Sequence, residues 1–157
     1  MNTTAKKPDN YQALDIKIKK IHTNAELPAY GSIESAGADL YACIEEDIVL
    51  KPGKRVVVPH GFSMELPLGF EAQIRSRSGL AFKNGIIVLN SPGTVDSDFR
   101  GELKTLLIHL GEEDFVIKNG MRISQMVISR HATANWVETS VLCDTNRGSG
   151  GYGSTGI

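Results

Sequence analysis

Residues 147–156 form the stretch of this sequence that is best equipped to hold an anion. They combine several glycines with one guanidinium, that of Arg147, and with the hydroxyls of Ser149, Ser154 and Thr155. A glycine-rich backbone can turn many N–H donors toward a ligand, and an arginine can pair bidentately with phosphate oxygens. The stretch is therefore a candidate polyphosphate-binding loop. The alternative is an inert Gly/Ser tail of the kind common at chain ends, although Arg147 and Tyr152 are unusual in such tails.

The same stretch contains the pattern G-x-G-x-x-G, at Gly148, Gly150 and Gly153. In a dinucleotide-binding fold this pattern follows a strand and opens a helix. Here Ile157 alone follows the last glycine of the stretch, Gly156, and leaves no room for a helix. We therefore do not expect a Rossmann fold.

A second candidate site is the loop from Gly93 to Gly101, which carries two acids, Asp96 and Asp98. If this loop is extended, the two carboxylates share a face and could activate water or hold a metal. The alternative is an ordinary acidic turn in which the aspartates satisfy their own backbone. That alternative is stronger for Asp98 than for Asp96, which follows the apolar Val95.

Three further motifs could contribute polar groups. The run from Arg75 to Ala81 places two arginines and two serines before a possible helix start, which suits an anion but also suits a plain capped turn. Asp39 is a lone acid among small residues, the type that is usually solvated or structural. Gln125 falls on the same strand face as Ile123 and Val127, so its amide needs a partner, either a backbone carbonyl or a ligand.

Composition limits the class of protein. The chain has 157 residues, of which 41% are hydrophobic and 22% charged, as expected for one domain with a real core. A formal net charge of −1 gives no electrostatic footprint for nucleic acid. No apolar run approaches the ~18 residues that span a bilayer, and residues 1–11 do not resemble a secretory signal. Two unclustered cysteines, Cys43 and Cys143, argue against a zinc site and favour a reducing compartment. We expect a cytoplasmic protein that contacts no membrane.

Short apolar runs separated by turn signals predict an all-β fold, either a sandwich, a jelly roll or a barrel. One helix is expected at Ser78 to Lys83, with Ser78 as its cap. Trp136 should lie in the core or in an interface. The predicted strands are residues 14–18, 56–58, 70–74, 86–89, 103–110, 122–128 and 136–142.

Taken together, five motifs in this order resemble the trimeric deoxyuridine triphosphate nucleotidohydrolase (dUTPase) family. The resemblance covers nearly all of the chain from about Leu14 onward. The motifs are AGADLYA from Ala36, RSRSGLA from Arg75, GTVDSDFRG from Gly93, GMRISQM from Gly120 and RGSGGYGSTG from Arg147.

The resemblance implies hydrolysis of dUTP to dUMP and pyrophosphate, with Mg²⁺ as cofactor. Asp96 matches the acid that activates the attacking water, and Asp39 matches the acid that anchors waters of the metal. Asn90 and Phe99 match the residues that read uracil and stack on deoxyribose, in an expected hairpin from Ile86 to about Phe99. The remaining substrate-binding positions are Arg77, Ser78, Gly79, Gly93, Thr94, Val95, Gln125, Arg147, Gly150, Gly151, Tyr152, Gly153 and Ser154.

The resemblance also implies a jelly-roll-like β-clip fold assembled as a homotrimer, with active sites shared between subunits. It divides the chain into a flexible extension (1–11), a β-domain (12–142) and a mobile glycine-rich tail that closes over a site (143–157). Two positions depart from the usual pattern: Phe99 replaces a tyrosine and Tyr152 replaces a phenylalanine.

Two other readings of the scaffold are open. A dCTP deaminase shares the fold but places a glutamate in the strand after the Asp96 loop, and residues 103–110 contain no acid. A non-catalytic nucleotide sensor could dispense with Asp96, which is present.

Overall fold

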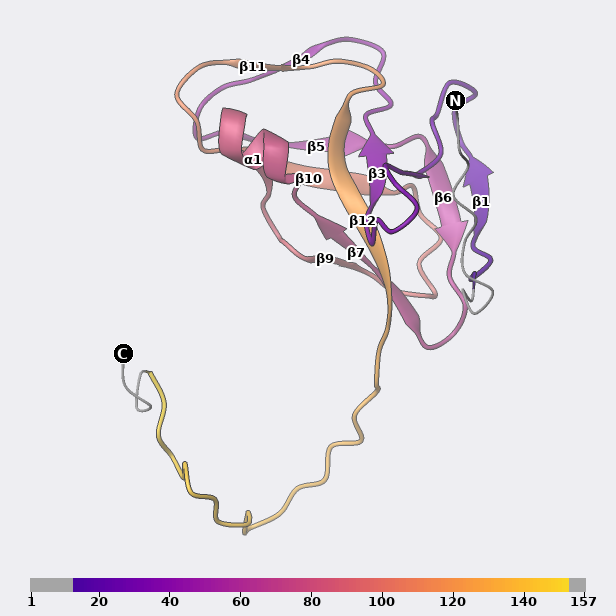
Figure 1. The fold of residues 1–157 in the computed structure, drawn as a ribbon. Helices are drawn as coiled ribbons and strands as arrows, with labels where there is room; N and C mark the ends of the chain where they lie inside the picture. The colour runs from indigo at the N-terminus through magenta and orange to yellow at the C-terminus, as the bar shows by residue number, and fades with distance from the viewer. Residues whose placement is uncertain (1–12, 153–157) are drawn as a thin grey trace.

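Strands are the main regular secondary structure of residues 13–152, which are the residues that the computed structural model describes (Figure 1). Within this range there is one α-helix, and the chain is otherwise strand and loop, which confirms the all-β prediction. The expected N-terminal extension, residues 1–11, lies outside the described residues, as do Gly153 and Ser154. The elements in chain order are β1 (Lys17–Lys20), β2 (Ala29–Tyr30), β3 (Ala38–Tyr41), β4 (Ile48–Leu50), β5 (Arg55–Pro59), β6 (Phe62–Glu65), β7 (Phe70–Arg75), α1 (Ser78–Asn84), β8 (Ile86–Val88), β9 (Gly93–Val95), β10 (Lys104–His109), β11 (Phe115–Ile117) and β12 (Arg122–Arg130).

Two sheets make up most of the body, a term used here for residues 13–130. The larger has the strand order β2-β3-β12-β7-β9, and the smaller has the order β5-β10-β8, with every pair antiparallel. The pairs β1-β6 and β4-β11 complete the fold. β12, the longest strand, lies at the centre of the larger sheet and carries one of the predicted motifs.

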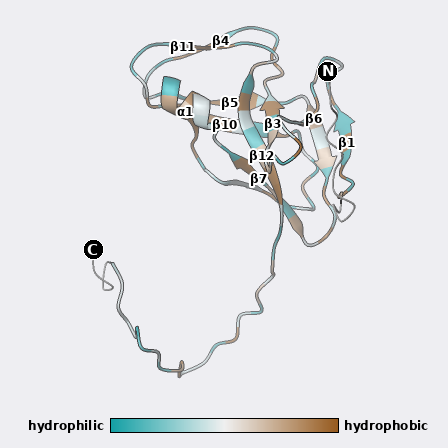
Figure 2. Cartoon of the chain, in the orientation of Figure 1, coloured by the Kyte–Doolittle hydropathy of each residue, from teal (hydrophilic) through white to brown (hydrophobic). Residues whose placement is uncertain are grey.

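One hydrophobic cluster fills the space between the two sheets. It joins Ala72, Ile74 and Met126 of the larger sheet to Val58 and Leu107 of the smaller one. In Figure 2 hydrophobic residues, drawn brown, and hydrophilic residues, drawn teal, both occur along central strands such as β7 and β12. Because alternate residues of a strand face opposite sides, the burial of every second residue in strands such as β3 and β10 fixes their register.

The helix α1 follows β7 directly and is close to its predicted position. Its N-cap residue is Arg77 rather than Ser78, and no side chain caps the first turn, so that detail of the prediction was wrong. Gly85 ends the helix in the left-handed region, at φ 65°. A Cβ at Gly85 would lie 2.4 Å from the backbone nitrogen of Gly111, so a larger residue cannot replace it without displacing that backbone.

Two predicted elements differ in the structure. Residues 136–142 form no strand: they lie exposed, and Trp136 is 90% exposed, so it is not part of the core of its own chain. The expected hairpin from Ile86 to Phe99 does not form either: β8 and β9 do not pair with each other, because β8 pairs with β10 and β9 pairs with β7. This segment crosses from one sheet to the other.

After β12 the chain leaves the body as a C-terminal arm, residues 131–152, which extends well away from the sheets in Figure 1. The amide of His131 still donates to Gly69 of the body, at 3.1 Å. Beyond it, described hydrogen bonds of the arm run only to other arm residues. The one helix found between residues 13 and 152 has seven residues, too few to cross a membrane.

Candidate active site

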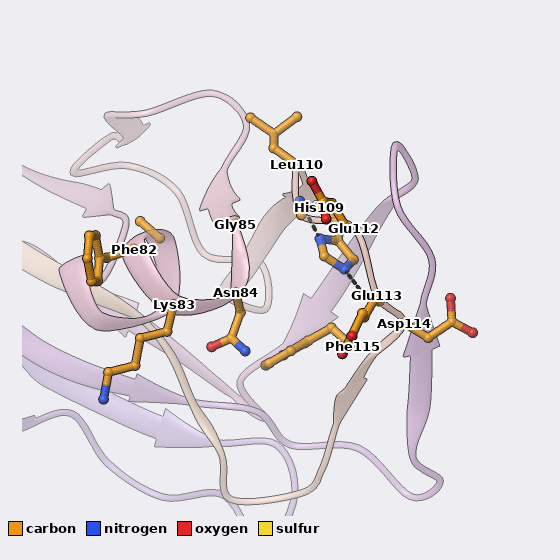
Figure 3. Close-up of a pocket in the computed structure, with 12 residues that line it drawn as sticks. Phe82, Lys83, Asn84, Gly85, His109, Leu110, Glu112, Glu113, Asp114 and Phe115 are labelled. Carbon is orange, nitrogen blue, oxygen red and sulfur yellow. Dashed lines mark hydrogen bonds between the residues drawn. The ribbon is translucent and has the colours of Figure 1, made fainter.

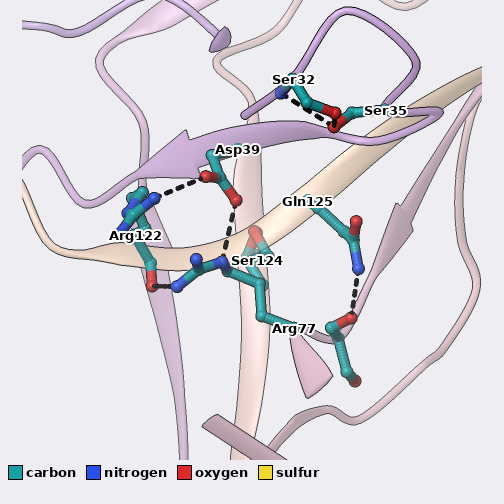
Figure 4. A network of polar contacts seen from close by, with 9 residues as sticks. Ser32, Ser35, Asp39, Arg77, Arg122, Ser124 and Gln125 are labelled. Carbon is teal, nitrogen blue, oxygen red and sulfur yellow. Dashed lines mark hydrogen bonds and ion pairs between the residues drawn. The ribbon is translucent and has the colours of Figure 1, made fainter. Parts of the chain in front are cut away.

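Asp39 lies at the centre of a network that joins three of the predicted motifs (Figure 4). Its Oδ1 accepts a hydrogen bond from Nε of Arg77 at 2.8 Å, and its Oδ2 accepts one from Nη1 of Arg122 at 3.1 Å. Arg77 also donates from Nη1 to the backbone carbonyl of Arg122, at 3.1 Å. Only 15% of the Asp39 side chain is exposed, so these charge-assisted bonds are partly shielded from water.

The network borders a cavity of about 450 Å³, called here the arginine pocket. Two arginines face one aspartate there, so the pocket carries a net positive charge and suits an anion. Its lining includes Gly37, Asp39, Arg77, Ser78, Gly79, Arg122 and Gln125. Ser78 and Gly79 occupy the first turn of α1, where no helix carbonyl accepts their amide hydrogens.

Gln125 spans two sides of the arginine pocket. Its Nε2 donates to the backbone carbonyl of Ser76 at 2.8 Å, so a backbone group supplies the partner that its amide needs. Its Oε1 lies against Gly37, where an added Cβ would approach it to 2.2 Å. Gly37 is therefore required for this placement of the amide. The predicted shared face with Ile123 was wrong: Ile123 is 1% exposed and belongs to the core, because the register of β12 against β3 shifts between Arg122 and Ser124.

Asp96 follows β9 and lines a second cavity of about 310 Å³, called here the Asp96 pocket. Thr94, Val95 and Phe99 line it too, with Leu103 and Lys104 from the next segment. Asp98 does not line the pocket, because Ser97 and Asp98 form a turn in which the amide of Phe99 donates to the carbonyl of Asp96, at 3.2 Å. The condition for paired carboxylates, an extended backbone, is not met.

The turn is held from outside by Arg100, whose Nη1 donates to the carbonyls of Ser97 and Phe99 at 2.6 and 2.9 Å. The Phe99 ring is 44% exposed and packs over Gly101, where an added Cβ would come within 2.6 Å of the ring. The loop thus presents one flat aromatic face beside Asp96.

The remaining predicted residues lie outside both pockets. Asn90 is exposed, and its Nδ2 lies 3.1 Å from the point where a Cβ of Gly93 would stand. Arg147 lies in the C-terminal arm and donates from Nε to the carbonyl of Gly150, at 2.9 Å. Gly151 and Tyr152 are exposed beside it. The arginine pocket and the Asp96 pocket share no lining residue.

Sequence reasoning missed three charged residues of these pockets, namely Arg122, Glu102 and Lys104. Arg122 stands within a predicted motif, but nothing in its spacing showed that it would pair with Asp39. Glu102 lines the Asp96 pocket just before β10, and its Oε2 lies 3.4 Å from Nζ of Lys104. Its Oε1 is buried without a hydrogen-bond partner among the described residues.

A third cavity, of about 550 Å³, is lined by none of the predicted site residues (Figure 3). It lies between α1 and the segment that joins β10 to β11. His109 borders it, but Nδ1 accepts from the amide of Gly111 at 3.0 Å and Nε2 donates to the carbonyl of Glu113 at 2.6 Å. With both ring nitrogens engaged, the imidazole has no nitrogen free for a ligand or a metal. The described residues also hold no group of three or more acidic, histidine or cysteine side chains that could bind a metal directly.

Comparisons with known proteins agree with these motifs. A family model described as dUTPase matches residues 23–156. The deoxyuridine 5'-triphosphate nucleotidohydrolase of Rickettsia typhi is 53% identical over 92% of this chain and 98% of its own, and that of Rickettsia felis is 54% identical over 90% and 97%.

Solved structures resemble the fold at much lower identity. The dUTPase of Staphylococcus bacteriophage 80alpha, solved with dUPNHPP, superposes with a TM-score of 0.83 at 22% identity, over 92% of this chain and 100% of that one. A mutant dUTPase of the Staphylococcus aureus phage phi11, reported with a structural Mg(II) ion, gives a TM-score of 0.75 at 18% identity, over 82% and 99%. These similarities confirm the predicted fold.

Proposed function

The chain belongs to the dUTPase family, and we propose that it hydrolyses dUTP to dUMP and pyrophosphate by attack of water on the α-phosphorus. The observation that carries this proposal is the identity of 53% to a deoxyuridine 5'-triphosphate nucleotidohydrolase over 92% of the chain. As a dUTP diphosphatase, the protein limits uracil in DNA and supplies dUMP for dTMP synthesis.

Asp96 acts as the general base. Its carboxylate takes a proton from water as the oxygen attacks the α-phosphorus, and the bond from that phosphorus to the bridging oxygen breaks, so that pyrophosphate leaves. Support comes from the Asp96 pocket, which has room for solvent beside the carboxylate. A positioned base of this kind contributes about 10²–10⁴-fold to the rate.

The arginine pocket binds the triphosphate. Arg77 and Arg122 are held in place by Asp39 before any ligand arrives, so little side-chain entropy is lost on binding. Ser78 and Gly79 offer hydroxyl and backbone donors, and Gln125 keeps a second N–H that its bond to Ser76 does not use. Arg147, on the free arm, closes over the far end of the triphosphate like an arginine finger.

Magnesium fits the arginine pocket through Asp39 and water. Each carboxylate oxygen accepts one guanidinium bond, which leaves further lone pairs for water, and Mg²⁺ readily keeps part of its water shell. The absence of a direct ligand cluster among the described residues agrees with this indirect mode. When bound, the ion neutralises charge on the triphosphate.

The segment around β9 selects the base and the sugar. We assign uracil recognition to Asn90 together with the backbone of Gly93, Thr94 and Val95, because fixed donors and acceptors reject cytosine by leaving buried groups unpaired. The ring of Phe99 stacks on deoxyribose and leaves no room for a 2'-hydroxyl. Tyr152 of the arm covers the base.

The protein works as a homotrimer with shared sites. The triphosphate-binding and base-activating residues line separate pockets in one copy, and the arm reaches neither. Four large apolar residues of the arm are at least 76% exposed, and water disfavours such exposure until another surface covers them. A neighbouring copy supplies that surface. The exposed residues are Trp136, Val137, Val141 and Leu142.

We place the protein in the cytoplasm, where dUTP is formed and used. Both cysteines are unpaired, Cys43 in the core and Cys143 on the arm, as a reducing compartment would keep them. A panel of dUTP, dCTP, UTP and dTTP with product analysis tests the substrate. Pyrophosphate from dUTP alone supports the proposal, whereas ammonia from dCTP would identify a deaminase.

The role of Asp96 is tested by Asp96→Asn, which keeps the shape of the side chain and removes the base. We expect unchanged dUTP binding by calorimetry and a turnover lowered by about 10²–10⁴-fold. Asp98→Asn is the matched control: Asp98 lies two residues away, in the turn and outside the pocket, so turnover should not change. Equal effects of the two variants would remove Asp96 from the role of base.

A further inference from the structure

β12 contains a β-bulge at the point where it carries the arginine pocket. Opposite β3, Arg122 pairs with Tyr41 and Ser124 pairs with Leu40, so Ile123 is an extra residue. Residues three apart face opposite sides of a regular strand, but the bulge lets Arg122 and Gln125 line the same pocket. Ile123 and Ser124, neighbours in sequence, are both buried, at 1% and 0% exposure.

A buried chain of hydrogen bonds connects the two strands on either side of this bulge. Nδ1 of His60 lies 2.7 Å from the carbonyl oxygen of Tyr41, on β3. Nε2 of the same ring lies 2.7 Å from Oγ1 of Thr105, on β10. Thr105 in turn lies 2.8 Å from Oγ of Ser124, on β12. The two ends of this hydrogen-bond chain belong to the two residue pairs on either side of the extra Ile123: Tyr41 pairs with Arg122, and Ser124 pairs with Leu40.

The direction of each bond in this chain follows from its first member. A carbonyl oxygen can only accept, so Nδ1 of His60 carries the hydrogen and the neutral ring accepts at Nε2. The hydroxyl of Thr105 therefore donates to His60, and the hydroxyl of Ser124 donates to Thr105. All three side chains are at most 1% exposed, and each depends on the next for its partner.

We propose that His60, Thr105 and Ser124 are positioning residues for dUTP hydrolysis, which hold the bulge of β12 and so keep Arg122 and Gln125 on the face of the arginine pocket. A bulge disrupts the ladder and leaves backbone groups unpaired, and the ring of His60 satisfies the carbonyl of Tyr41 at that point. None of the three side chains lines the pocket, so they act through Arg122 and Gln125. The inference rests on the proposed function, because the pocket is taken to bind the triphosphate.

Thr105→Val tests the inference, because valine keeps the shape and removes the hydroxyl that both neighbours need. We expect the KM for dUTP to rise about tenfold, because the two buried hydrogen bonds of this hydroxyl are lost. The dissociation constant of deoxyuridine, which has no phosphate, should stay within about twofold when measured by NMR titration, because the uracil-binding segment lies outside the bulge. Thr105→Ser, which restores a hydroxyl, should return the KM to the wild-type value.

Leu107→Val is the matched control for a loss of stability. Leu107 is buried two residues further along β10 and takes no part in the chain of hydrogen bonds. Shortening its side chain should therefore leave the KM for dUTP unchanged. Should Thr105→Val fail to fold, Ser124→Ala breaks one bond at the bulge itself and is expected to raise the same KM. An unchanged KM in the folded variant, or an equal loss of deoxyuridine and dUTP binding, would overturn the inference. A wild-type protein that releases no pyrophosphate from dUTP would instead contradict the proposed function.

Discussion

Asp39 in the body and Arg147 in the C-terminal arm both belong to the proposed triphosphate site, but the structure holds them very differently. Both carboxylate oxygens of Asp39 accept guanidinium bonds, one from Arg77 at the start of α1 and one from Arg122 of β12, and 15% of its side chain is exposed. Among the residues that the structure describes, the guanidinium of Arg147 bonds only to the carbonyl of Gly150, three residues away in the same arm.

The difference separates two ways of building a site. Side chains of the body are placed by strand register and by the bulge of β12, so the arginine pocket exists before substrate arrives. In the proposed function, residues of the arm gain their position only when the arm docks on a body, and the entropy cost of ordering the arm is met at that moment. Removing the arm should therefore affect turnover without affecting folding. Changes to the buried network should affect substrate binding and, at low pH, the stability of the fold.

Deletion of residues 147–157 should have the largest effect on turnover. We expect the rate of pyrophosphate release to fall by roughly 10³-fold, as when an arginine finger is lost. The thermal midpoint should not change, because described residues of this segment make no hydrogen bond to the body. Calorimetry and a pyrophosphate assay measure the two quantities. A truncated chain that melts earlier would show that the segment supports the fold.

Two controls separate the guanidinium from the rest of the arm and test sharing between copies. Arg147→Lys keeps the charge and loses the bidentate fork, so it should recover little of the rate. Mixing the truncated chain with the Asp96→Asn chain should restore partial turnover, because each copy supplies what the other lacks. Zero recovery, with mixed oligomers verified by native mass spectrometry, would contradict shared sites.

The body was predicted from the sequence far better than the arm. Short apolar runs between turn signals correctly predicted β7 and β12, because both strands find partners within the chain. The same kind of pattern failed at residues 136–142, since a strand also needs a neighbour and one copy supplies none there. The motifs predicted which residues gather in the arginine pocket. They could not show the bulge at Ile123 or the partnership of Arg122 with Asp39, because both depend on the pairing of distant strands.

Acid should destabilise the body through His60, and we expect this to be the second largest of the predicted effects. Burial is the main cause that lowers the pKa of His60, from 6.5 to about 4. The unfolded chain therefore takes up a proton near pH 6.5 while the folded chain stays neutral until about pH 4. Stability is complete above the unfolded pKa and falls through this window by about 3 kcal/mol, with no further loss below it.

Denaturant titrations of the wild type and of His60→Asn between pH 7 and pH 4 measure this contribution. Asparagine can still donate to the carbonyl of Tyr41 but does not titrate, so the free energy of unfolding should depend less on pH in the variant. The chain lacking residues 147–157 is the matched control, because its body is intact and its pH dependence should equal that of the wild type. Identical slopes for wild type and His60→Asn would assign the acid sensitivity to other groups.

Thiol labelling gives the smallest effect and compares the two regions directly. Cys143 is exposed on the arm, whereas Cys43 is buried in the body beside Asn24, whose Oδ1 lies 3.6 Å from its Sγ. Burial, with a smaller contribution from Glu102, raises the pKa of the Cys43 thiol, so little of it is thiolate at neutral pH. Under native conditions iodoacetamide should modify Cys143 at least about tenfold faster than Cys43. Peptide mass spectrometry over a time course measures both rates, and labelling of Cys43 in denaturant provides the reference for full exposure. Equal rates in the native protein would show that the body opens as readily as the arm.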